Sequence, residues 1–194
     1  AASDVYKRQG RIYVYLVQSA PEGSPGPGSS TADGMRALFS GIDERLDPIL
    51  ERLDDSVPIH HGDLYDLPVI SFGEGRALLL GDAAHAMTPN MGQGAGTAIE
   101  DAAGLALLLK QGVPVSELAG ALDALRRKRV TSVQTRSWRI GKTAHMEGAM
   151  LCWARDLALR MMSLLPSERQ ARAMWQPGID LAEDCLLYTS PSPR

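Results

Sequence analysis

An aspartate and two glycines in the middle of the chain have the types and spacing of a site for an anionic or electron-accepting ligand. Asp82 follows the apolar run at residues 77–80, and Gly92 and Gly94 precede a stretch with helical periodicity. A carboxylate can accept hydrogen bonds from sugar hydroxyls, while glycines let a flat ring or a phosphate approach the backbone. A helix beginning at Gly94 would direct unpaired N–H groups and its positive dipole end at the ligand. This pattern predicts a site that stabilises negative charge.

Such a site needs a strand before it and a helix after it, and the sequence predicts both. Residues 77–80 (ALLL) have the composition of a short strand buried on both faces, with Asp82 at its carboxyl end, where open α/β sheets bind ligands. The helix should run from Gly94 until Gly112 and Pro114 stop it, a length of about 25 Å. Because it is apolar around most of its circumference, we expect it to be buried.

The other segments are assigned from turn residues and hydrophobic periodicity. They are a strand at 11–18, a loop at 20–30, a helix at 31–53 capped by Asp33 and bent at Pro48, a strand at 57–67, and, after a cap at Ser116, helical segments that include 133–150 and 151–165.

The segment GDAAHAMTPNMGQGAGTAIEDA, residues 81–102, resembles the signature of the class A FAD-dependent aromatic-ring monooxygenases. That signature is GDAAH, a spacer with proline, GQG, and a helix carrying Glu-Asp-Ala. The resemblance implies that Asp82 binds the ribityl or pyrophosphate part of FAD and that the backbone of residues 92–95 faces the N1/C2=O edge of the flavin. Pro89 would lie beside the reactive C4a/N5 side. The implied cofactor-binding set is Gly81, Asp82, Pro89, Gly92, Gln93, Gly94 and Ala95.

The resemblance implies a cytoplasmic enzyme that reduces FAD with NADPH or NADH and hydroxylates an aromatic or similar small ring through a flavin C4a-hydroperoxide formed with O2. The cofactor would carry the chemistry, so no catalytic side chain and no metal ion are expected. Two alternatives remain open at this point. One is a related flavin oxidoreductase of the halogenase or polyprenyl reductase type, and the other is an inactive helical remnant.

The expected fold class is α/β, with part of a Rossmann-like FAD-binding domain, a piece of the substrate-domain sheet and a helical C-terminal tail. The boundaries are a substrate-domain piece at 10–62, an FAD-binding segment at 63–114 and C-terminal helices at 115–184, between adapter-like, non-native ends at 1–9 and 185–194. No GxGxxG motif for the adenosine pyrophosphate is found, because the glycines at 23–28 alternate with prolines. We therefore expect a fragment that lacks half of the FAD site and is inactive alone.

Composition argues against several other classes of protein. The formal net charge of −3 gives no basic surface for nucleic acid, and no apolar run reaches the ~20 residues of a membrane-spanning helix. Cys152 and Cys185 form no CxxC pair, which fits a reducing compartment and argues against a zinc site. The adjacent His60 and His61 would point to opposite faces of a strand, which argues against a shared metal.

Four other groups of residues have structural interpretations. His85 is expected to be a structural hydrogen-bonding residue, and Glu100 and Asp101 are expected to cap or brace buried polar groups. The basic run at 126–129 could touch an NADPH phosphate, but a solvated helix face is the favoured interpretation. The last group is the Met and Trp content from Trp138 to Trp175, which indicates packing, although Met146, Met150 and Trp153 could line a partner interface.

Overall fold

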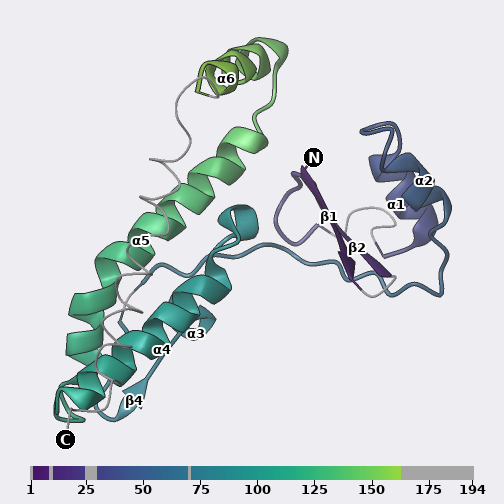
Figure 1. The fold of residues 1–194 in the computed structure, drawn as a ribbon. Helices are drawn as coiled ribbons and strands as arrows, with labels where there is room; N and C mark the ends of the chain where they lie inside the picture. Colours follow the sequence, from purple (N-terminus) through teal and green to yellow (C-terminus); the bar gives the residue numbers. More distant parts are fainter. Residues whose placement is uncertain (1, 9–10, 25–29, 70, 163–194) are drawn as a thin grey trace, which may run out of the picture. The chain divides into compact units, whose positions relative to one another are not determined.

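The computed structural model of the protein describes residues 2–8, 11–24, 30–69 and 71–162, and side chains from residue 13 to residue 161 within these ranges. The chain divides into two compact units, residues 1–64 and 65–194, which are described separately (Figure 1).

The first unit begins with an antiparallel hairpin. Strand β1 (Ala2–Arg8) pairs with strand β2 (Arg11–Val17), in a register that runs from Ala2 opposite Val17 to Arg8 opposite Arg11. The strand predicted at 11–18 is therefore confirmed. The segment expected to be a non-native tail supplies the partner strand, because extended backbone next to an unpaired strand satisfies its own N–H and C=O groups by pairing.

Two short helices follow where the sequence predicted one. Helix α1 (Ala32–Phe39) is capped by Thr31, whose side chain accepts a hydrogen bond from the Gly34 N–H, and not by Asp33. The chain then turns through Gly41 at a φ of 77°, and helix α2 (Asp47–Glu51) begins with Pro48 in its first turn. Proline is tolerated there because the first N–H groups of a helix have no partner within it. It therefore starts a helix rather than bending one.

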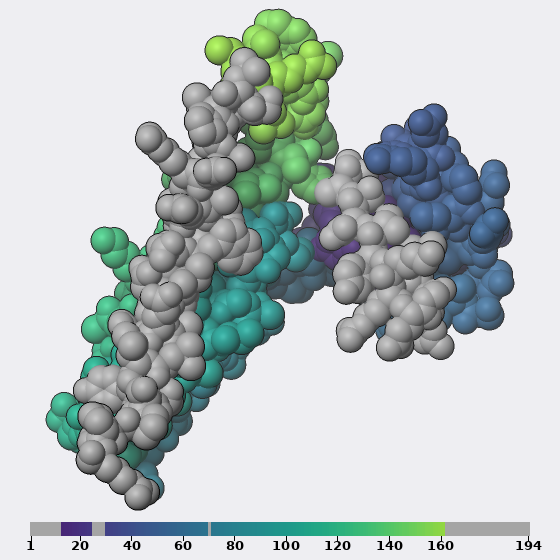
Figure 2. All heavy atoms as spheres, viewed as in Figure 1, coloured from purple at the N-terminus to yellow at the C-terminus, as the bar shows by residue number. Residues whose placement is uncertain are grey.

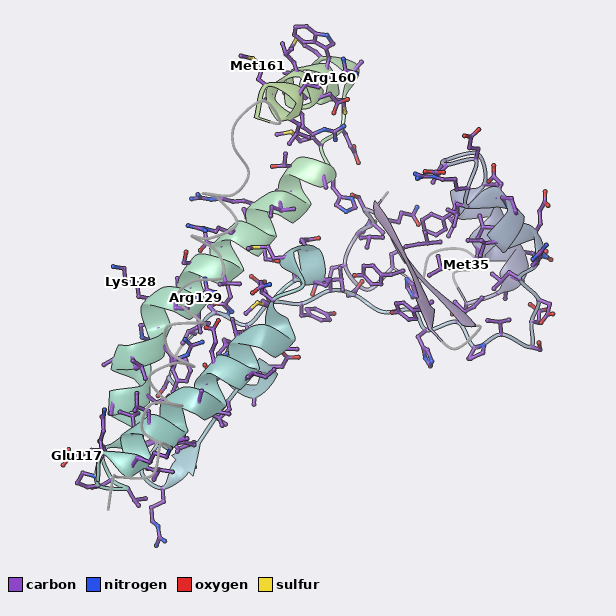
Figure 3. All side chains as sticks on the ribbon, in the orientation of Figure 1. Met35, Glu117, Lys128, Arg129, Arg160 and Met161 are labelled. Carbon is purple, nitrogen blue, oxygen red and sulfur yellow. The ribbon has the colours of Figure 1, made fainter. Side chains whose placement is uncertain are left out.

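The apolar residues of the two helices form the core of the first unit. Phe39, Leu46 and Leu50 are buried, and partly buried residues of β2 and α1 pack against them, including Met35 on the inner side of α1 (Figure 3). The strand predicted at 57–67 is absent. Residues 57–69 are irregular, and Val57, Leu64 and Leu67 are exposed, because the alternating pattern meets no neighbouring strand with which to pair.

The second unit opens with a very short hairpin, β3 (Gly73–Glu74) and β4 (Ala77–Leu78). The prediction of a strand at 77–80 buried on both faces is wrong for the described residues, because Ala77 and Leu79 are exposed. Burial on both faces requires layers above and below the sheet, and only β3 pairs with β4 here. The described strands form antiparallel hairpins, so the parallel Rossmann-like sheet stays a prediction.

The rest of the described second unit is helical. It contains α3 (Asp82–His85), the 3-10 turn η1 (Pro89–Met91), α4 (Gly94–Lys110), α5 (Leu118–Ala144) and α6 (Ala149–Met162).

Helix α4 begins and ends as the sequence predicts, but only one of its faces is buried. The buried residues are Thr97, Asp101, Gly104 and Leu108, which recur at helical spacing. Ile99, in contrast, is 70% exposed. An apolar circumference shows that a helix can be buried all round, but the elements packed against it decide whether it is.

Helix α5 runs without a break through the position where the sequence predicted a new helix at 133. It lies against α4 over much of its length (Figure 1), and Figure 2 draws the heavy atoms of both helices in the same view. Gly104 permits the close approach, since a Cβ there would lie 3.0 Å from Leu125 Cδ2. Phe72, Leu122 and Val130 belong to the core of this unit. From Leu118 onward the described part of the tail is helical except at residues 145–148, so the break between helices falls there and not at the predicted boundary between residues 150 and 151. The tail beyond Met162 lies outside the described residues.

Candidate functional site

The turn that precedes Asp82 has a backbone conformation reserved for glycine. Gly81 is buried with φ 56° and ψ −137°, and an added Cβ would lie 2.9 Å from the Ala98 Cβ. The Gly81 N–H donates to the Asp101 carboxylate over 3.0 Å. The turn is therefore locked against helix α4 both by close packing and by a buried hydrogen bond.

Asp82 lies beside the start of helix α4. Its side chain is exposed, and its Oδ1 is 3.9 Å from the point where a Cβ on Gly94 would stand. The cap residue Gln93 makes no side-chain hydrogen bond to the end of the helix. An exposed carboxylate therefore adjoins backbone N–H groups that have no partner within the helix, so that an acceptor and several donors lie next to each other.

The remaining predicted residues lie in the loop between α3 and α4 and in the first turn of α4. Pro89 and Gly92 are exposed at the two ends of η1, with Gly92 in the left-handed conformation at φ 61° and no atom near its missing side chain. Ala95 is exposed in the first turn of α4. Gln93 is buried, and its carbonyl accepts hydrogen bonds from the Thr97 N–H and hydroxyl.

Behind this surface lies a buried network centred on Asp101. His85 and Asp101 are both 0% exposed, and His85 Nε2 lies 2.5 Å from Asp101 Oδ2. The other oxygen, Oδ1, accepts from Arg126 Nε over 2.9 Å. The expectations that His85 is structural and that Asp101 braces buried polar groups agree with this geometry. His85 Nδ1 is a buried polar atom for which no partner is found within the described residues.

The basic run in α5 divides between two environments. Arg126 is 3% exposed and also donates to Glu100 Oε2 over 2.6 Å, while Arg129 pairs with Glu100 Oε1 over 3.2 Å. Lys128 points away from α4 into solvent (Figure 3). The interpretation of the whole run as a solvated face is thus wrong for Arg126. Residues on opposite sides of one helix meet different neighbours, which consecutive letters do not reveal.

Burial by itself would raise the pKa of Asp101, but the hydrogen bonds that the carboxylate accepts outweigh it. Donors on His85, on Arg126 and on the Gly81 backbone together hold the pKa of Asp101 below its ordinary value. The carboxylate is therefore charged in the folded state. It follows that His85 Nε2 carries the hydrogen that it shares with Asp101.

A row of polar residues on α5 holds the loop in place. Ser137 Oγ donates to the Thr88 carbonyl over 2.5 Å, and Asn90 Nδ2 donates to the Ser137 carbonyl over 3.0 Å. One turn earlier, Gln134 donates to the carbonyls of Leu67 and Ala86. Sequence reasoning did not assign these α5 residues, because their roles depend on helix α5 lying against residues more than forty positions away.

Gly81→Ala should lower the free energy of unfolding of the second unit by about 2–4 kcal/mol, from backbone strain together with the clash at Ala98. Gly112→Ala is a matched control, because Gly112 also has a positive φ, 76°, but no atom within 4 Å of its missing side chain. That control should cost only about 1–2 kcal/mol. Urea denaturation followed by tryptophan fluorescence measures both, and equal losses would contradict the packing argument.

The lowered pKa of Asp101 predicts acid sensitivity. As the pH falls below the unfolded value of about 4, the unfolded chain takes up a proton before the folded one does, so stability should be lost as the pH drops toward the folded pKa. Above about pH 4 the contribution should be fully present. Urea denaturation should be measured between pH 6 and pH 3, a range of roughly three units that includes the unfolded pKa of about 4. The free energy of unfolding should decline less steeply with falling pH for Asp101→Asn than for the unaltered chain. Parallel declines would contradict the prediction.

Tryptophan fluorescence isolates this effect from other carboxyl groups. Hydrogen bonds from Arg45 and Ser56 also lower the pKa of Asp43 and Asp54, but both aspartates lie in residues 1–64. All three tryptophans lie in residues 65–194. Their signal therefore reports on the unit that contains Asp101.

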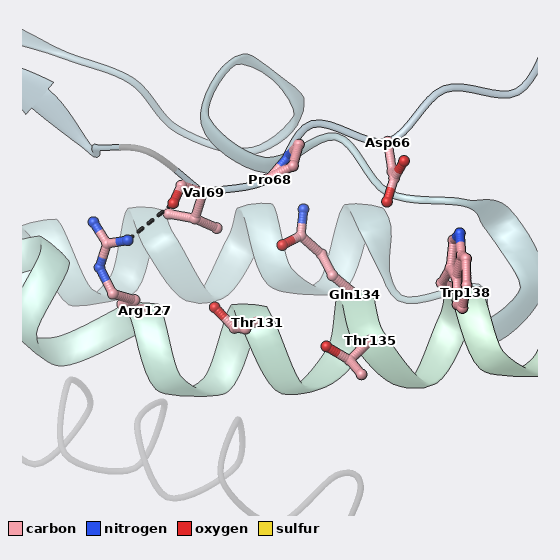
Figure 4. A pocket seen from close by; sticks show the side chains of 8 residues that line it. All are labelled: Asp66, Pro68, Val69, Arg127, Thr131, Gln134, Thr135 and Trp138. Carbon is pink, nitrogen blue, oxygen red and sulfur yellow. Dashed lines mark hydrogen bonds between the residues drawn. The ribbon is translucent and has the colours of Figure 1, made fainter.

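A groove of about 540 Å³ lies between helix α5 and the segment before Phe72 (Figure 4). It is lined by Asp66, Pro68, Val69, Arg127, Thr131, Gln134, Thr135 and Trp138. Arg127 closes one end by donating to the Val69 carbonyl over 2.9 Å. None of the residues expected to bind FAD lines this groove, so it is a feature separate from the Asp82 site.

Within the described ranges, no cluster of His, Cys, Asp and Glu side chains could hold a metal ion. Among the helices of those ranges, none is long and apolar enough to cross a bilayer. Met146, Met150 and Trp153 are all exposed at the end of α5 and on α6, so they do not form a packed core with described residues.

Comparisons with known proteins identify the kind of domain to which the segment that contains the site is similar. Residues 66–137 match the family model described as FAD binding domain. The aurachin C monooxygenase/isomerase of Stigmatella aurantiaca is 36% identical over 156 residues, which make up 80% of this chain and 40% of that protein. The 2-heptyl-3-hydroxy-4(1H)-quinolone synthase of Pseudomonas aeruginosa is 32% identical over 155 residues, with the same shares. The chain thus spans about 40% of the length of these curated relatives.

The fold agrees with this assignment. The structure of Klebsiella pneumoniae HpxO in complex with FAD and uric acid superposes with a TM-score of 0.68 at 23% identity, covering 91% of this chain and 45% of that one. The family match places Asp82, helix α4 and the Asp101 network within one recognised domain. Residues 66–137 thus match an FAD binding domain, in a chain that is similar over 80% of its length to the aurachin C monooxygenase/isomerase.

Proposed function

We propose that this chain belongs to an FAD-dependent monooxygenase that hydroxylates an aromatic or similar small ring with NAD(P)H and O2. The observation that carries the proposal is the juxtaposition of the Asp82 carboxylate and the uncapped N-terminus of helix α4. The relatives support it, because one is named a monooxygenase and matches across 80% of this chain.

The residues present fit part of FAD. The exposed Asp82 would accept hydrogen bonds from the ribityl hydroxyls or lie beside the pyrophosphate region, and its position next to Gly94 leaves the backbone accessible. The N–H groups of Gly94 and Ala95 would face the N1/C2=O edge of the ring. When bound, FAD supplies the redox chemistry, accepting electrons from the nicotinamide and delivering them to O2.

The protein's own contribution at this site is orientation and charge. The positive end of the α4 dipole would stabilise negative charge on the reduced ring, an effect of about 0.3–1 kcal/mol at a surface and up to ~2 kcal/mol when partly buried. Pro89 and Gly92 would shape the edge of the ring site, because both are exposed beside that helix end. No side chain acts as a nucleophile in this proposal.

We further propose that this chain alone does not bind FAD tightly and is inactive. It spans about 40% of its curated relatives, and it contains no GxGxxG motif for the adenosine pyrophosphate. Titrating the purified chain with FAD, followed by quenching of flavin fluorescence, should give no submicromolar affinity. Submicromolar binding would overturn this part of the proposal.

The activity is tested on the full-length gene product. Reaction with NADH or NADPH and candidate aromatic compounds should consume O2 and yield product that contains one atom from ¹⁸O2. Halide-dependent product would indicate a halogenase instead, and reduction of substrate without O2 uptake would indicate a reductase. Either result would overturn the monooxygenase proposal.

A further inference from the structure

We propose that Asp101 is a positioning residue for the cofactor site, which holds the Asp82 carboxylate against the N-terminus of helix α4. This inference rests on the proposed function. It concerns a residue that lies a full two turns inside α4, away from the exposed surface where FAD would bind.

The first step is that one oxygen of Asp101 holds both ends of the short helix that carries Asp82. Asp101 Oδ2 accepts from the Gly81 N–H at the start of α3, over 3.0 Å, and contacts His85 Nε2 at its end, over 2.5 Å. Asp82 is the first residue of α3. The position of Asp82 relative to α4 is therefore fixed by Asp101, a buried residue of α4 itself.

The second step is that the Asp101 carboxylate is itself oriented. Its other oxygen accepts from Arg126 Nε over 2.9 Å, and Arg126 is held in turn by Glu100. Asp101 has no exposed surface, so water cannot replace a lost partner. Rotation of the carboxylate would break bonds to α3 or to α5, and this leaves a single arrangement.

The third step is that Asp82 lacks such restraint from its own side chain, which is exposed. Residues 79–81, which end in the side-chain-free Gly81, link Asp82 to β4. Loss of the Asp101 contacts should let α3 move away from Gly94, and the 3.9 Å spacing between that glycine's missing Cβ position and Asp82 Oδ1 would widen. The acceptor and the helix donors would then no longer meet one ligand together.

The test compares FAD dissociation constants of full-length variants. Asp101→Asn should weaken FAD binding about 10-fold or more, because an amide nitrogen cannot accept the hydrogen bonds that the lost oxygen accepted. Leu108→Ala is the control, since Leu108 belongs to the same unit's core but its apolar side chain takes no part in the hydrogen bonds that join Asp101 to Gly81 and His85. It should lower stability and leave FAD affinity unchanged.

A double-mutant cycle that combines Asp82→Ala with Asp101→Asn separates a positioning role from a general loss of stability. If Asp101 acts through Asp82, the FAD affinity of Asp82→Ala should fall by less than about 3-fold further when Asp101→Asn is added. Independent, multiplying losses would overturn the proposal, and so would an Asp101→Asn affinity equal to that of the Leu108→Ala control.

His85 provides a second arm that does not depend on whether Asp101→Asn folds. His85→Gln keeps an amide that can donate to Asp101 and should bind FAD within about 3-fold of the unaltered protein, whereas His85→Ala should bind about 10-fold more weakly. Equal affinities for the two variants would overturn the proposal. Failure of the unaltered full-length protein to bind FAD would instead overturn the proposed function, and the positioning role with it.

Discussion

Replacing Arg126 with methionine should lower the free energy of unfolding of the second unit by about 3–5 kcal/mol, because the change leaves the charge of Asp101 buried without its cation. Arg126 has a 4% exposed side chain and donates to two carboxylates, those of Glu100 and Asp101. Such a loss is a large fraction of the ~5–15 kcal/mol that holds a typical domain folded. Urea denaturation followed by tryptophan fluorescence measures it.

The matched control is the neighbouring Arg127→Met. Arg127 pairs with Asp123 within the same helix and donates to the Val69 carbonyl, but its side chain is 41% exposed. Solvent screens the ion pair and can replace the lost hydrogen bond, so this change should cost less, about 1–2 kcal/mol. If the two variants lost equal stability, the difference between the buried and the exposed arginine would not hold.

Asp82→Ala should weaken FAD binding by the full-length protein about 10-fold to 100-fold, the loss expected when a charged acceptor of hydrogen bonds is removed from a binding site. Stability should change little, because Asp82 is exposed and its side chain supports no buried group. Quenching of flavin fluorescence gives the dissociation constant, and urea denaturation gives the stability.

Asp66→Ala is the control for this experiment. Asp66 is also an exposed aspartate of the second unit, but it lines the groove beside α5 and lies outside the segment 81–102 that contains the proposed cofactor-binding residues. Its replacement should leave FAD affinity unchanged. An Asp82→Ala affinity equal to that of the control would remove Asp82 from the proposed cofactor-binding residues.

Local signals in the sequence were sufficient for the motif and for the ends of helix α4. Gly94 begins the helix, and Gly112 and Pro114 follow its end, because these residues act on the backbone near them whatever else packs there. The proximity of Asp82 to the helix start was also predictable, since only the short segment 83–93, which contains Gly92, separates them.

Tertiary contacts decided what the local signals left open. Arg126 and Lys128 stand two positions apart in one basic run, yet one is buried against Asp101 and the other is exposed, because only one side of α5 faces α4. Likewise, the apolar run at 77–80 has the composition of a buried strand, but its burial depends on layers packed against it. Periodicity states what a face can bury, and only the folded neighbours determine what it does bury.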